Sequence, residues 1–371
     1  MKFLDCVIVN PKISLKKGKV YPFIEMANVS TSYREPLLIE YKSFDSGAKF
    51  QDGDTVIARI TPCLQNGKRF YCKNIGTGFG STEYLVFRPK NKLVNNLFLY
   101  YFMQTEFIKL QMINSMVGAT GRQRVNNNVF NDIELNLPDI KIQKNIGKTL
   151  SAYDDLIENN QKQIKLLEEA AQRLYKEWFV DLRFPDYEKT PIIDGVPKGW
   201  KKELVNNLLE NVKRTKEIKS SDYKNVGLIP IIDQSRNFLA GYTNDKEALI
   251  NKNLPVIIFG DHTRILKFIL FPFAKGADGT QLIISNNNRM PQSLLYFSLI
   301  AVDLSNYHYA RHYKYLKAKS ILVPTKKIAD EFDKYIFVIL LQIQKLRDIS
   351  TKCVEARNRL LSKLMSGEMD V

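Results

Sequence analysis

The chain has 371 residues, of which 55 are Lys or Arg and 39 are Asp or Glu, and its formal net charge is +16 at pH 7. This length is ample for two cores of ordinary size. Too few apolar residues follow Met1-Lys2 for a secretory signal, and no apolar run is long enough to predict a transmembrane helix. The four Cys show no C-x-x-C spacing, which argues against a zinc site and a disulfide framework and favours reduced thiols in a cytosolic protein.

Residues 1–138 are expected to form a first globular segment that mixes strands with one helix. The strands are predicted from alternating or continuous β-branched and aromatic residues, and the helix from a suitable N-cap before a long apolar stretch. A basic loop with two Gly separates the helix from the last strand. The expected elements are strands at Thr55–Ile60 and Tyr84–Phe87, a helix from Asn95 to about Ile113, the loop 118–130 and a strand at Asp132–Leu137.

One long amphipathic helix is expected over residues 139–183. No Pro occurs between Pro138 and Pro185, and apolar or small side chains recur at steps of three, four or seven residues, which is a heptad pattern. About 40 residues at about 1.5 Å each predict a helix roughly 60 Å long that ends near Pro185. The seam consists of Ile146, Leu150, Tyr153, Ile157, Ile164, Leu167, Ala171, Leu174 and Trp178, with Asn160 as its one polar position.

Residues 184–325 repeat the order of the first globular segment with much less likeness in sequence. A turn-rich linker precedes strands, an apolar helix, a basic loop and a final strand. The expected elements are strands at Leu254–Phe259, Ile265–Phe271 and Gln281–Ser285, a helix over Ser293–Val302, the loop 306–319 and a strand at Ser320–Val323.

A second copy of the long helix is expected over residues 326–371. A shift of 186 residues places its seam without a gap, and eight of the ten seam positions are apolar or Cys. We interpret the copies as two helices that pack on each other as a coiled coil, although two ordinary amphipathic core helices are the alternative. Polar seam residues would fix register and orientation. The second seam is Phe332, Ile336, Ile339, Ile343, Leu346, Ser350, Cys353, Arg357, Leu360 and Leu364.

The positive charge is confined almost wholly to the two globular segments. Residues 1–138 and 184–325 each carry a net charge of +7, residues 139–183 are neutral, and residues 326–371 carry +2. Two equally basic segments suggest two contacts to one polyanion, most simply DNA. General solubility charge is the alternative, and it does not predict the equal division.

Signatures of catalysis are missing from the sequence. There is no G-x4-G-K-[ST] phosphate loop, no Asn-Pro-Pro-aromatic tetrad of an amino-methyltransferase, and no β-α-β context around the Gly at 76, 78 and 80. Asp261, His262 and Arg264 could form an acid–base group. We prefer a turn that presents His262, Thr263 and Arg264 to DNA, and a solvated turn with a hydrogen-bonded His is the alternative. The chain is therefore not expected to be an enzyme.

The polar loops supply the candidate DNA contacts. Arg suits the edge of guanine and Gln the edge of adenine in the major groove, and both, like Lys and His, also bind phosphate. An exposed turn that contacts only phosphate is the alternative for each loop. The candidates are Lys68, Arg69, Arg122, Gln123, Arg124 and Asn126 in the first segment, and Arg236, His262, Thr263, Arg264, Arg311 and Lys314 in the second.

Motifs along nearly the whole chain resemble the specificity subunits of Type I restriction–modification systems. Each motif alone is weak, but together, in this order around a helical repeat, they are specific. They are GDTVIARITPCLQNGK (53–68), GSTEYLVFRP (80–89), TGRQRV (120–125), RLYKEWFVDLRFP (173–185), GVPKGWK (195–201), PIIDQSRNFLAGYT (230–243), IIFGDHTR (257–264), FAKGADGT (273–280) and RLLSKLMSGEM (359–369).

The resemblance implies an α+β fold with two target-recognition domains, residues 1–138 and 184–325, that contain small mixed β-sheets and helices. Spacer helices 139–183 and 326–371 would form an antiparallel coiled coil that acts as a ruler. Each domain would read one half of a bipartite, asymmetric site on double-stranded DNA. Two modification subunits that methylate adenine and two restriction subunits would join this chain in a prokaryotic cytoplasmic complex, associated with the nucleoid when it is bound to DNA.

The same resemblance implies that this chain binds no cofactor and no metal, because S-adenosylmethionine, ATP and Mg²⁺ would belong to the partner subunits. No membrane contact is expected. Two other readings stay open at this point. One is a coiled-coil adaptor whose basic segments bind RNA or an acidic protein. The other is a self-sufficient DNA methyltransferase or nuclease, which the missing cofactor and metal motifs disfavour.

Overall fold

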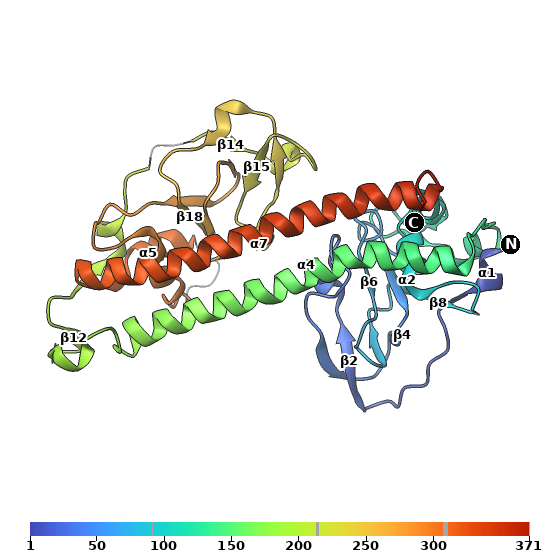
Figure 1. Cartoon of the computed structure of the whole chain (residues 1–371), viewed down its shortest axis with the longest axis horizontal. Coiled ribbons are helices and arrows are strands. Elements are labelled where there is room, and N and C mark those ends of the chain that lie inside the picture. The colour runs from blue at the N-terminus through green and yellow to red at the C-terminus, as the bar shows by residue number, and fades with distance from the viewer. Residues whose placement is uncertain (91, 213–214, 307–310, 371) are drawn as a thin grey trace. The chain divides into compact units, whose positions relative to one another are not determined.

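A computed structural model describes residues 1–90, 92–212, 215–306 and 311–370. The chain forms two compact units (Figure 1). Unit 1 combines Met1–Lys162 with Leu346–Val371, and unit 2 is the continuous stretch Gln163–Lys345. Two long helices, α4 (Ile140–Tyr175) and α7 (Lys326–Ser366), each contribute residues to both units.

Unit 1 contains two four-stranded sheets, with the strand orders β1-β8-β5-β6 and β3-β2-β7-β4. The second sheet is mixed, because β2 and β7 run parallel while the other pairs are antiparallel. The elements are α1 (Phe3–Cys6), β1 (Val7–Val9), β2 (Val20–Ile24), β3 (Glu40–Ser43), β4 (Ala48–Phe50), β5 (Thr55–Ala58), β6 (Arg69–Tyr71), β7 (Gly78–Gly80), β8 (Tyr84–Pro89), α2 (Asn96–Phe102), α3 (Glu106–Asn114), β9 (Met116–Val117), β10 (Arg124–Val125) and 3-10 turns at Met26–Asn28 and Asn127–Asn131.

Two predictions for unit 1 are wrong. The helix expected from Asn95 to Ile113 is two helices, because the backbone of Thr105 is extended and serves as the N-cap of α3. The N-cap predicted at Asn95 is present, since Asn95 Oδ1 accepts a hydrogen bond from Phe98 N at 3.1 Å. The stretch Asp132–Leu137 is no strand. It forms a single β-bridge, between Glu134 and Lys2, because the chain enters α1 directly after Lys2.

Unit 2 confirms the predicted strands and the apolar helix. Its three-stranded antiparallel sheet has the order β19-β18-β21, and a second sheet has the order β14-β20-β15-β16 with β17 also on β20. The elements are β11 (Ile192–Ile193), β12 (Val196–Pro197), β13 (Lys201–Leu204), β14 (Glu217–Ile218), β15 (Ile229–Ile232), β16 (Gly241–Thr243), β17 (Leu249–Ile250), β18 (Val256–Gly260), β19 (Leu266–Ile269), β20 (Phe273–Gly276), β21 (Thr280–Ile283), α5 (Gln292–Ile300), α6 (His312–Lys317), β22 (Ser320–Val323) and 3-10 turns at Tyr187–Lys189, Val205–Leu208, Ser220–Asp222 and Lys246–Ala248.

The expected loop 306–319 is in part the helix α6, whose buried His312 and Leu316 fix it to the unit, and residues 307–310 lie outside the described residues.

The two units repeat one sheet topology. In unit 1, β2 pairs with β3 antiparallel and with β7 parallel, and β4 joins the other side of β7. In unit 2, β15 pairs in the same way with β16 and β20, and β17 joins β20. The antiparallel trio β8-β5-β6 likewise matches β21-β18-β19. The repeat that the helices suggested from sequence therefore extends to the sheets.

The long helices confirm the predicted seam. All ten seam positions of α7 are buried or half-buried. The seam positions of the first long helix, including the polar Asn160, are buried or half-buried as well. In unit 1, Asn160 Nδ2 donates to Ser350 Oγ at 3.2 Å, so the polar seam positions of the two copies meet. In unit 2, Trp178 lies against Phe332 with ring centroids 5.8 Å apart. Within unit 1, Asp154 pairs with Arg357 and Asn160 with Ser350, so the partner residues fall in number along α7 as they rise along α4, which is the antiparallel arrangement. The helical path ends in a π-turn, Lys176–Val180, five residues before Pro185.

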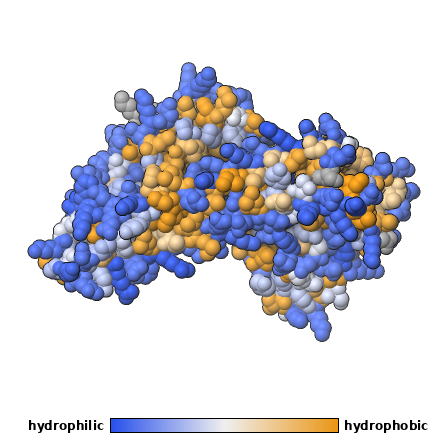
Figure 2. Space-filling view, viewed as in Figure 1, coloured by the Kyte–Doolittle hydropathy of each residue, from blue (hydrophilic) through white to orange (hydrophobic). Residues whose placement is uncertain are grey.

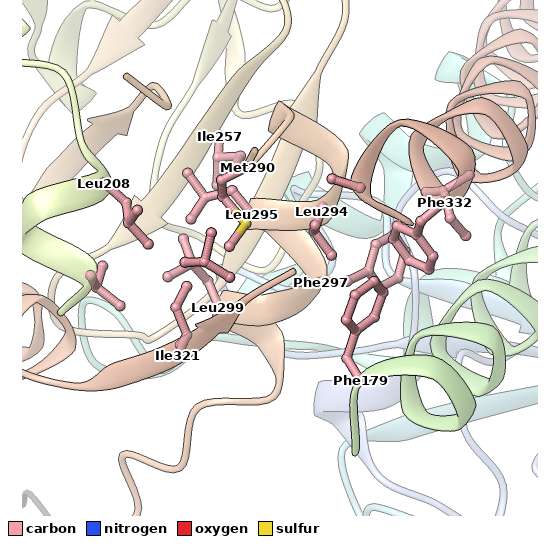
Figure 3. Packing of buried hydrophobic residues seen from close by; sticks show 14 of the residues in the cluster. Phe179, Leu208, Ile257, Met290, Leu294, Leu295, Phe297, Leu299, Ile321 and Phe332 are labelled. Atoms are coloured by element: carbon pink, nitrogen blue, oxygen red, sulfur yellow. The ribbon is translucent and has the colours of Figure 1, made fainter. Parts of the chain in front are cut away.

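The core of unit 2 shows how the seam joins the globular part. Helix α5 lies between the sheet and α7: Leu295 faces Ile257 and Met290 on one side, and Phe297 faces Phe179 and Phe332 on the other (Figure 3). All of these side chains are buried. Truncation of a ring such as Phe332 to Ala would cost about 3–5 kcal/mol, because it leaves a cavity in a packed core.

Candidate nucleic-acid interface

Three polar loops meet at one edge of the sheets in unit 1. They are residues 59–68 after β5, residues 81–83 before β8, and residues 118–126 around β10. Backbone hydrogen bonds join them: Arg59 N donates to Glu83 O at 2.8 Å, Thr61 N donates to Gln123 O at 3.0 Å, and Val125 N donates to Arg59 O at 3.0 Å. The fold thus gathers segments that lie far apart in the sequence into one polar surface.

Three predicted contacts sit side by side in the last of these loops. Arg122 and Arg124 are exposed and Gln123 is half-buried. The guanidinium of Arg124 grips the carboxylate of Glu83 with Nη2–Oε1 and Nε–Oε1 distances of 2.7 and 2.9 Å, and this hydrogen bond and charge raise the pKa of Arg124. Glu83 therefore holds Arg124 in one direction and neutralises it locally. Arg122 is exposed and has no carboxylate partner among the described residues.

Lys68 and Arg69 are turned inward instead. Lys68 Nζ donates to the carbonyl of Met26 at 2.7 Å, and Arg69 Nη1 donates to the carbonyls of Gly67 at 2.7 Å and Thr31 at 3.3 Å. Both side chains brace the segment that follows β2. A third predicted contact is also engaged, because Asn126 Oδ1 accepts from Asn128 N at 3.1 Å and caps a 3-10 turn. These three residues support the surface more than they extend from it.

In unit 2 the corresponding loops converge on Gln234, which sequence reasoning missed. Its Oε1 accepts from His262 N at 3.0 Å, its backbone oxygen accepts from Thr263 Oγ1 at 2.7 Å, and its Nε2 donates to Asp278 O at 2.5 Å. A Cβ at Gly279 would come within 2.8 Å of the His262 ring and 2.9 Å of Gln234 Nε2, and its φ is +72°, so a side chain there would be strained and would displace these two groups. The motif GADGT marks this position, but nothing in the sequence alone links it to the other loops.

His262, Thr263 and Arg236 are exposed on this loop cluster, as predicted for residues that face a ligand. Arg264 is half-buried and adopts a positive φ of 61°; its Nη1 donates to Leu304 O at 3.0 Å. Asp261 is buried, and its carboxylate accepts from Tyr313 N at 2.8 Å. Asp261 and Arg264 thus bond to two different segments, and the backbone N–H of His262 is held by Gln234.

The last two candidates border α6. Arg311 precedes the helix and Lys314 lies on it, and both are exposed. The Lys314 ammonium lies 5.7 Å from the centre of the Tyr315 ring. The backbone of this helix is tied to the loop cluster, because His312 N donates to Asp261 O at 2.9 Å. The structure therefore brings Arg311 and Lys314 to the border of the His262 surface.

A buried lysine supports the loop that carries Arg236. Lys267 on β19 is 4% exposed, and its ammonium donates to the carbonyls of Asp233 at 2.7 Å and Asn237 at 2.5 Å. Burial lowers the pKa of Lys267 to about 8, while the charge of Asp233 opposes this shift. Alternation in the sequence predicted only an ordinary strand here, so this clamp was missed.

A second missed feature ties a loop of unit 1 to the long helices. Arg34, which is 1% exposed, donates from Nε and Nη2 to the carboxylate of Glu158 at 2.7 and 2.6 Å, and from Nη1 to Ser151 Oγ at 2.8 Å. Its Nη2 also donates to Asp155 Oδ1 at 2.6 Å. The guanidinium thus fastens the segment after β2 to α4.

The polar seam residue Arg357 belongs to the same region. Its guanidinium pairs with Asp154 and donates to the carbonyl of Ser32 at 3.0 Å, and Asp154 also accepts from the hydroxyl of Tyr101 at 2.5 Å. Burial and the charge of Asp154 raise the pKa of Tyr101 far above its usual value. Arg357 was noted in the sequence only as an exception in the seam; its partner Asp154 gave no signal.

The described residues contain no group of three His, Cys, Asp or Glu side chains arranged to hold a metal ion. Within the same residues, no helix is both long and apolar enough to cross a membrane. The described surface offers instead two loop clusters, each with exposed polar and cationic side chains on a rigid support. Such clusters bind phosphates and the edges of bases.

Comparisons with known proteins agree with this arrangement. Residues 8–169 match the family described as Type I restriction modification DNA specificity domain. The Type I restriction enzyme MjaIX specificity subunit of Methanocaldococcus jannaschii is 23% identical over 309 residues, which are 76% of this chain and 71% of that protein. The Type I restriction enzyme EcoAI specificity subunit of Escherichia coli is 31% identical over 146 residues, 37% of this chain and 25% of that protein.

The fold is also found in a solved structure. The crystal structure of the Type I restriction-modification system S subunit from M. genitalium superposes with a TM-score of 0.57 at 14% identity, over 98% of this chain and 95% of that one. This likeness concerns the fold alone, and it extends over both units and both long helices. The chain is therefore similar in sequence to the specificity subunits of Type I restriction–modification systems, and similar in fold to the solved S subunit.

Proposed function

We propose that this chain recognises a bipartite, asymmetric site on double-stranded DNA and scaffolds the enzymes that act there. The observation that carries the proposal is the repeated topology, in which two units with the same strand order each gather polar loops at one edge. Each unit would read one half-site. The target-recognition domains would be residues 1–138 and 184–325, and residues 139–183 and 326–371 would set the unread spacer.

The residues at the two surfaces support different half-sites. Unit 1 offers Arg122, Gln123 and the oriented Arg124, while unit 2 offers Arg236, His262 and Thr263. Bidentate Arg suits guanine and Gln suits adenine, so the two sets have different base preferences. The equal charge of +7 on residues 1–138 and 184–325 would supply the electrostatic part of the affinity, which falls as salt rises.

Assembly would use the outer faces of the long helices. On α7, Tyr335, Val338 and Leu341 are exposed at a spacing that places them on one stripe, and apolar patches lie among hydrophilic residues on the face seen in Figure 2. We propose this stripe as a docking surface for a modification subunit. In the complete complex, two modification and two restriction subunits would bring S-adenosylmethionine, ATP and Mg²⁺, and this chain would have no catalysis of its own. The complex would work in the cytoplasm of a prokaryote.

The decisive experiment maps methylated adenines in DNA exposed to the chain together with its modification partner. The expected result is a gapped motif of two different parts. A contiguous palindrome, or no motif, would overturn the proposal. Arg236→Ala should relax the preference at one half only, with Lys202→Ala, an exposed lysine of the same unit outside the loop cluster, as the control.

The chain incubated alone with DNA and S-adenosylmethionine, or with Mg²⁺, tests the enzyme alternative. No turnover is expected.

A further inference from the structure

A hollow of about 410 Å³ lies in unit 1 beside the predicted reading surface. Its walls come from the segment after β1, the turn before β4, and the ends of β5 and β8. Three basic side chains line it, namely Lys12, Lys49 and Arg59, together with Asn10 and Thr82. No carboxylate is among the lining residues. Three cations around one hollow without a counter-charge make a strongly positive site.

The three cationic side chains also have hydrogen-bond donors available for a ligand. Arg59 donates from Nη2 to the carbonyl of Val125 at 2.8 Å, but its buried Nε finds no hydrogen-bond partner among the described residues. The Lys49 ammonium lies 5.1 Å from the centre of the Phe44 ring, and Lys12 is exposed. A guanidinium has five N–H donors, so Arg59, like the ammonium groups of Lys12 and Lys49, can donate to the acceptor oxygens of an anionic ligand.

The walls are built rather than incidental. Asn10 adopts a positive φ of 51°, and its side-chain oxygen accepts from Val86 N at 3.1 Å, which fixes the segment after β1. Gly47 has a φ of +132°, and a Cβ there would come within 2.1 Å of the carbonyl of Gly80. Only glycine therefore allows the turn that brings Lys49 to the hollow.

The hollow is continuous with the reading surface. Arg59 bonds through its backbone to Glu83 and Val125, and Glu83 holds Arg124. A duplex read by Arg122 and Arg124 would therefore bring its sugar–phosphate backbone to this hollow.

A hollow of about 400 Å³ in unit 2 also has lysines in its lining, but it includes the carboxylate of Glu210, and its Lys275 is paired with Glu217 at 2.6 Å.

We infer that Lys12, Lys49 and Arg59 seat one backbone phosphate of the DNA that unit 1 reads. The inference rests on the proposed function, because it assigns the phosphate to a duplex that Arg122 and Gln123 contact beside the hollow. Three donors around one phosphate fix the duplex against the unit without reading a base. The seat would therefore set the register from which Arg122 and Gln123 reach base edges.

The test compares full-length wild type with Lys12→Gln/Lys49→Gln in binding to a duplex that holds the mapped site, over a range of salt concentrations. Loss of one phosphate contact should make the slope of log K against log [salt] less negative by about 1, with the base preference of both halves unchanged. The matched control is Lys141→Gln/Lys144→Gln, which removes two exposed charges of α4 in the same unit and should leave the slope as it is.

A scan with single methylphosphonates then locates the contact. Neutralising one particular phosphate should weaken wild type several-fold and leave the double variant unaffected. An unchanged slope in the double variant, or an equal change in the control, overturns the phosphate seat while the reading function stands. A wild-type chain that does not prefer its mapped site overturns the reading function itself.

Discussion

Replacing Arg34 by Met should destabilise unit 1 strongly. The guanidinium is 1% exposed and makes four hydrogen bonds to α4, two of them to Glu158, whose carboxylate is 4% exposed. The methionine fills much of the volume but leaves the Glu158 carboxylate buried, with Lys73 at 3.4 Å as its remaining ion-pair partner among the described residues. Breaking a buried pair from one side costs about 3–5 kcal/mol, and we expect a loss of that order.

The partner variants complete a double-mutant cycle. Glu158→Gln removes the charge but leaves Arg34 its bonds to Asp155 and Ser151, so it should cost less than Arg34→Met. The double variant Arg34→Met/Glu158→Gln removes both charges, and it should be clearly more stable than the sum of the single losses predicts, by about 0.5–3 kcal/mol. This sign follows because the main cost of each single change is a buried group without its partner.

Urea unfolding of the full chain, followed by far-ultraviolet circular dichroism, measures these differences. The two tryptophans, Trp178 and Trp200, both belong to unit 2, so their fluorescence reports on that unit separately. Hydrogen exchange of residues 30–37 reports on the loop that Arg34 fastens. A loss below about 1 kcal/mol for Arg34→Met, or additive single losses, would refute the claim that this network holds the loop to α4.

Three further predictions concern other parts of the chain. The pKa of Lys267 is about 8 in the folded chain and 10.5 when unperturbed, so the unfolded chain binds more protons than the folded chain between these pH values. The stability of wild type should therefore rise by about 3 kcal/mol from pH 8 to 10.5 relative to that of Lys267→Met. Equal pH profiles of the two proteins in urea unfolding would contradict this. Asn160→Leu/Ser350→Leu should raise the melting temperature, because it replaces a polar seam pair by an apolar contact. The two long helices should also pair in a less defined register, which broadens the unfolding transition. A lower melting temperature with an unchanged transition width would count against a register role of the polar pair. One heptad added at corresponding positions of both long helices lengthens each helix by about 10 Å, so the unread spacer should grow by roughly three base pairs while both half-sites stay the same. Mapping of methylated adenines measures the spacer. Altered half-sites would show that the helices do not set the spacing independently.

The long helices were predictable because one physical pattern governs them. A heptad seam needs only the order of apolar residues, and the ungapped shift of 186 residues then identified the partner helix. The strands β5, β18 and β22 were found for a similar local reason, since runs of β-branched residues suffice to mark them. The single helix over 95–113 failed because its break depends on one extended residue, Thr105.

The candidate surfaces were predicted in outline but not in detail. Exposed Arg122, His262 and Thr263 follow from loop composition, whereas the inward direction of Lys68 and Arg69 depends on carbonyls of a distant loop. Gln234 and Arg34 carry no local signal at all, because their roles arise only when segments remote in the sequence meet. Long-range hydrogen bonds of this kind leave no periodicity for a sequence pattern to reveal.

The discontinuous composition of unit 1 has a consequence for how the protein is made. Its core includes Leu364, and Arg357 reaches Ser32 and Asp154, so the chain's last helix completes a unit that begins at Met1. Unit 2 is one continuous stretch and can close as soon as residue 345 has left the ribosome, whereas unit 1 must wait for the final turns of α7. A premature stop codon shortly before Arg357 would therefore spare the second unit and leave the first, synthesised earliest, without its closing helix.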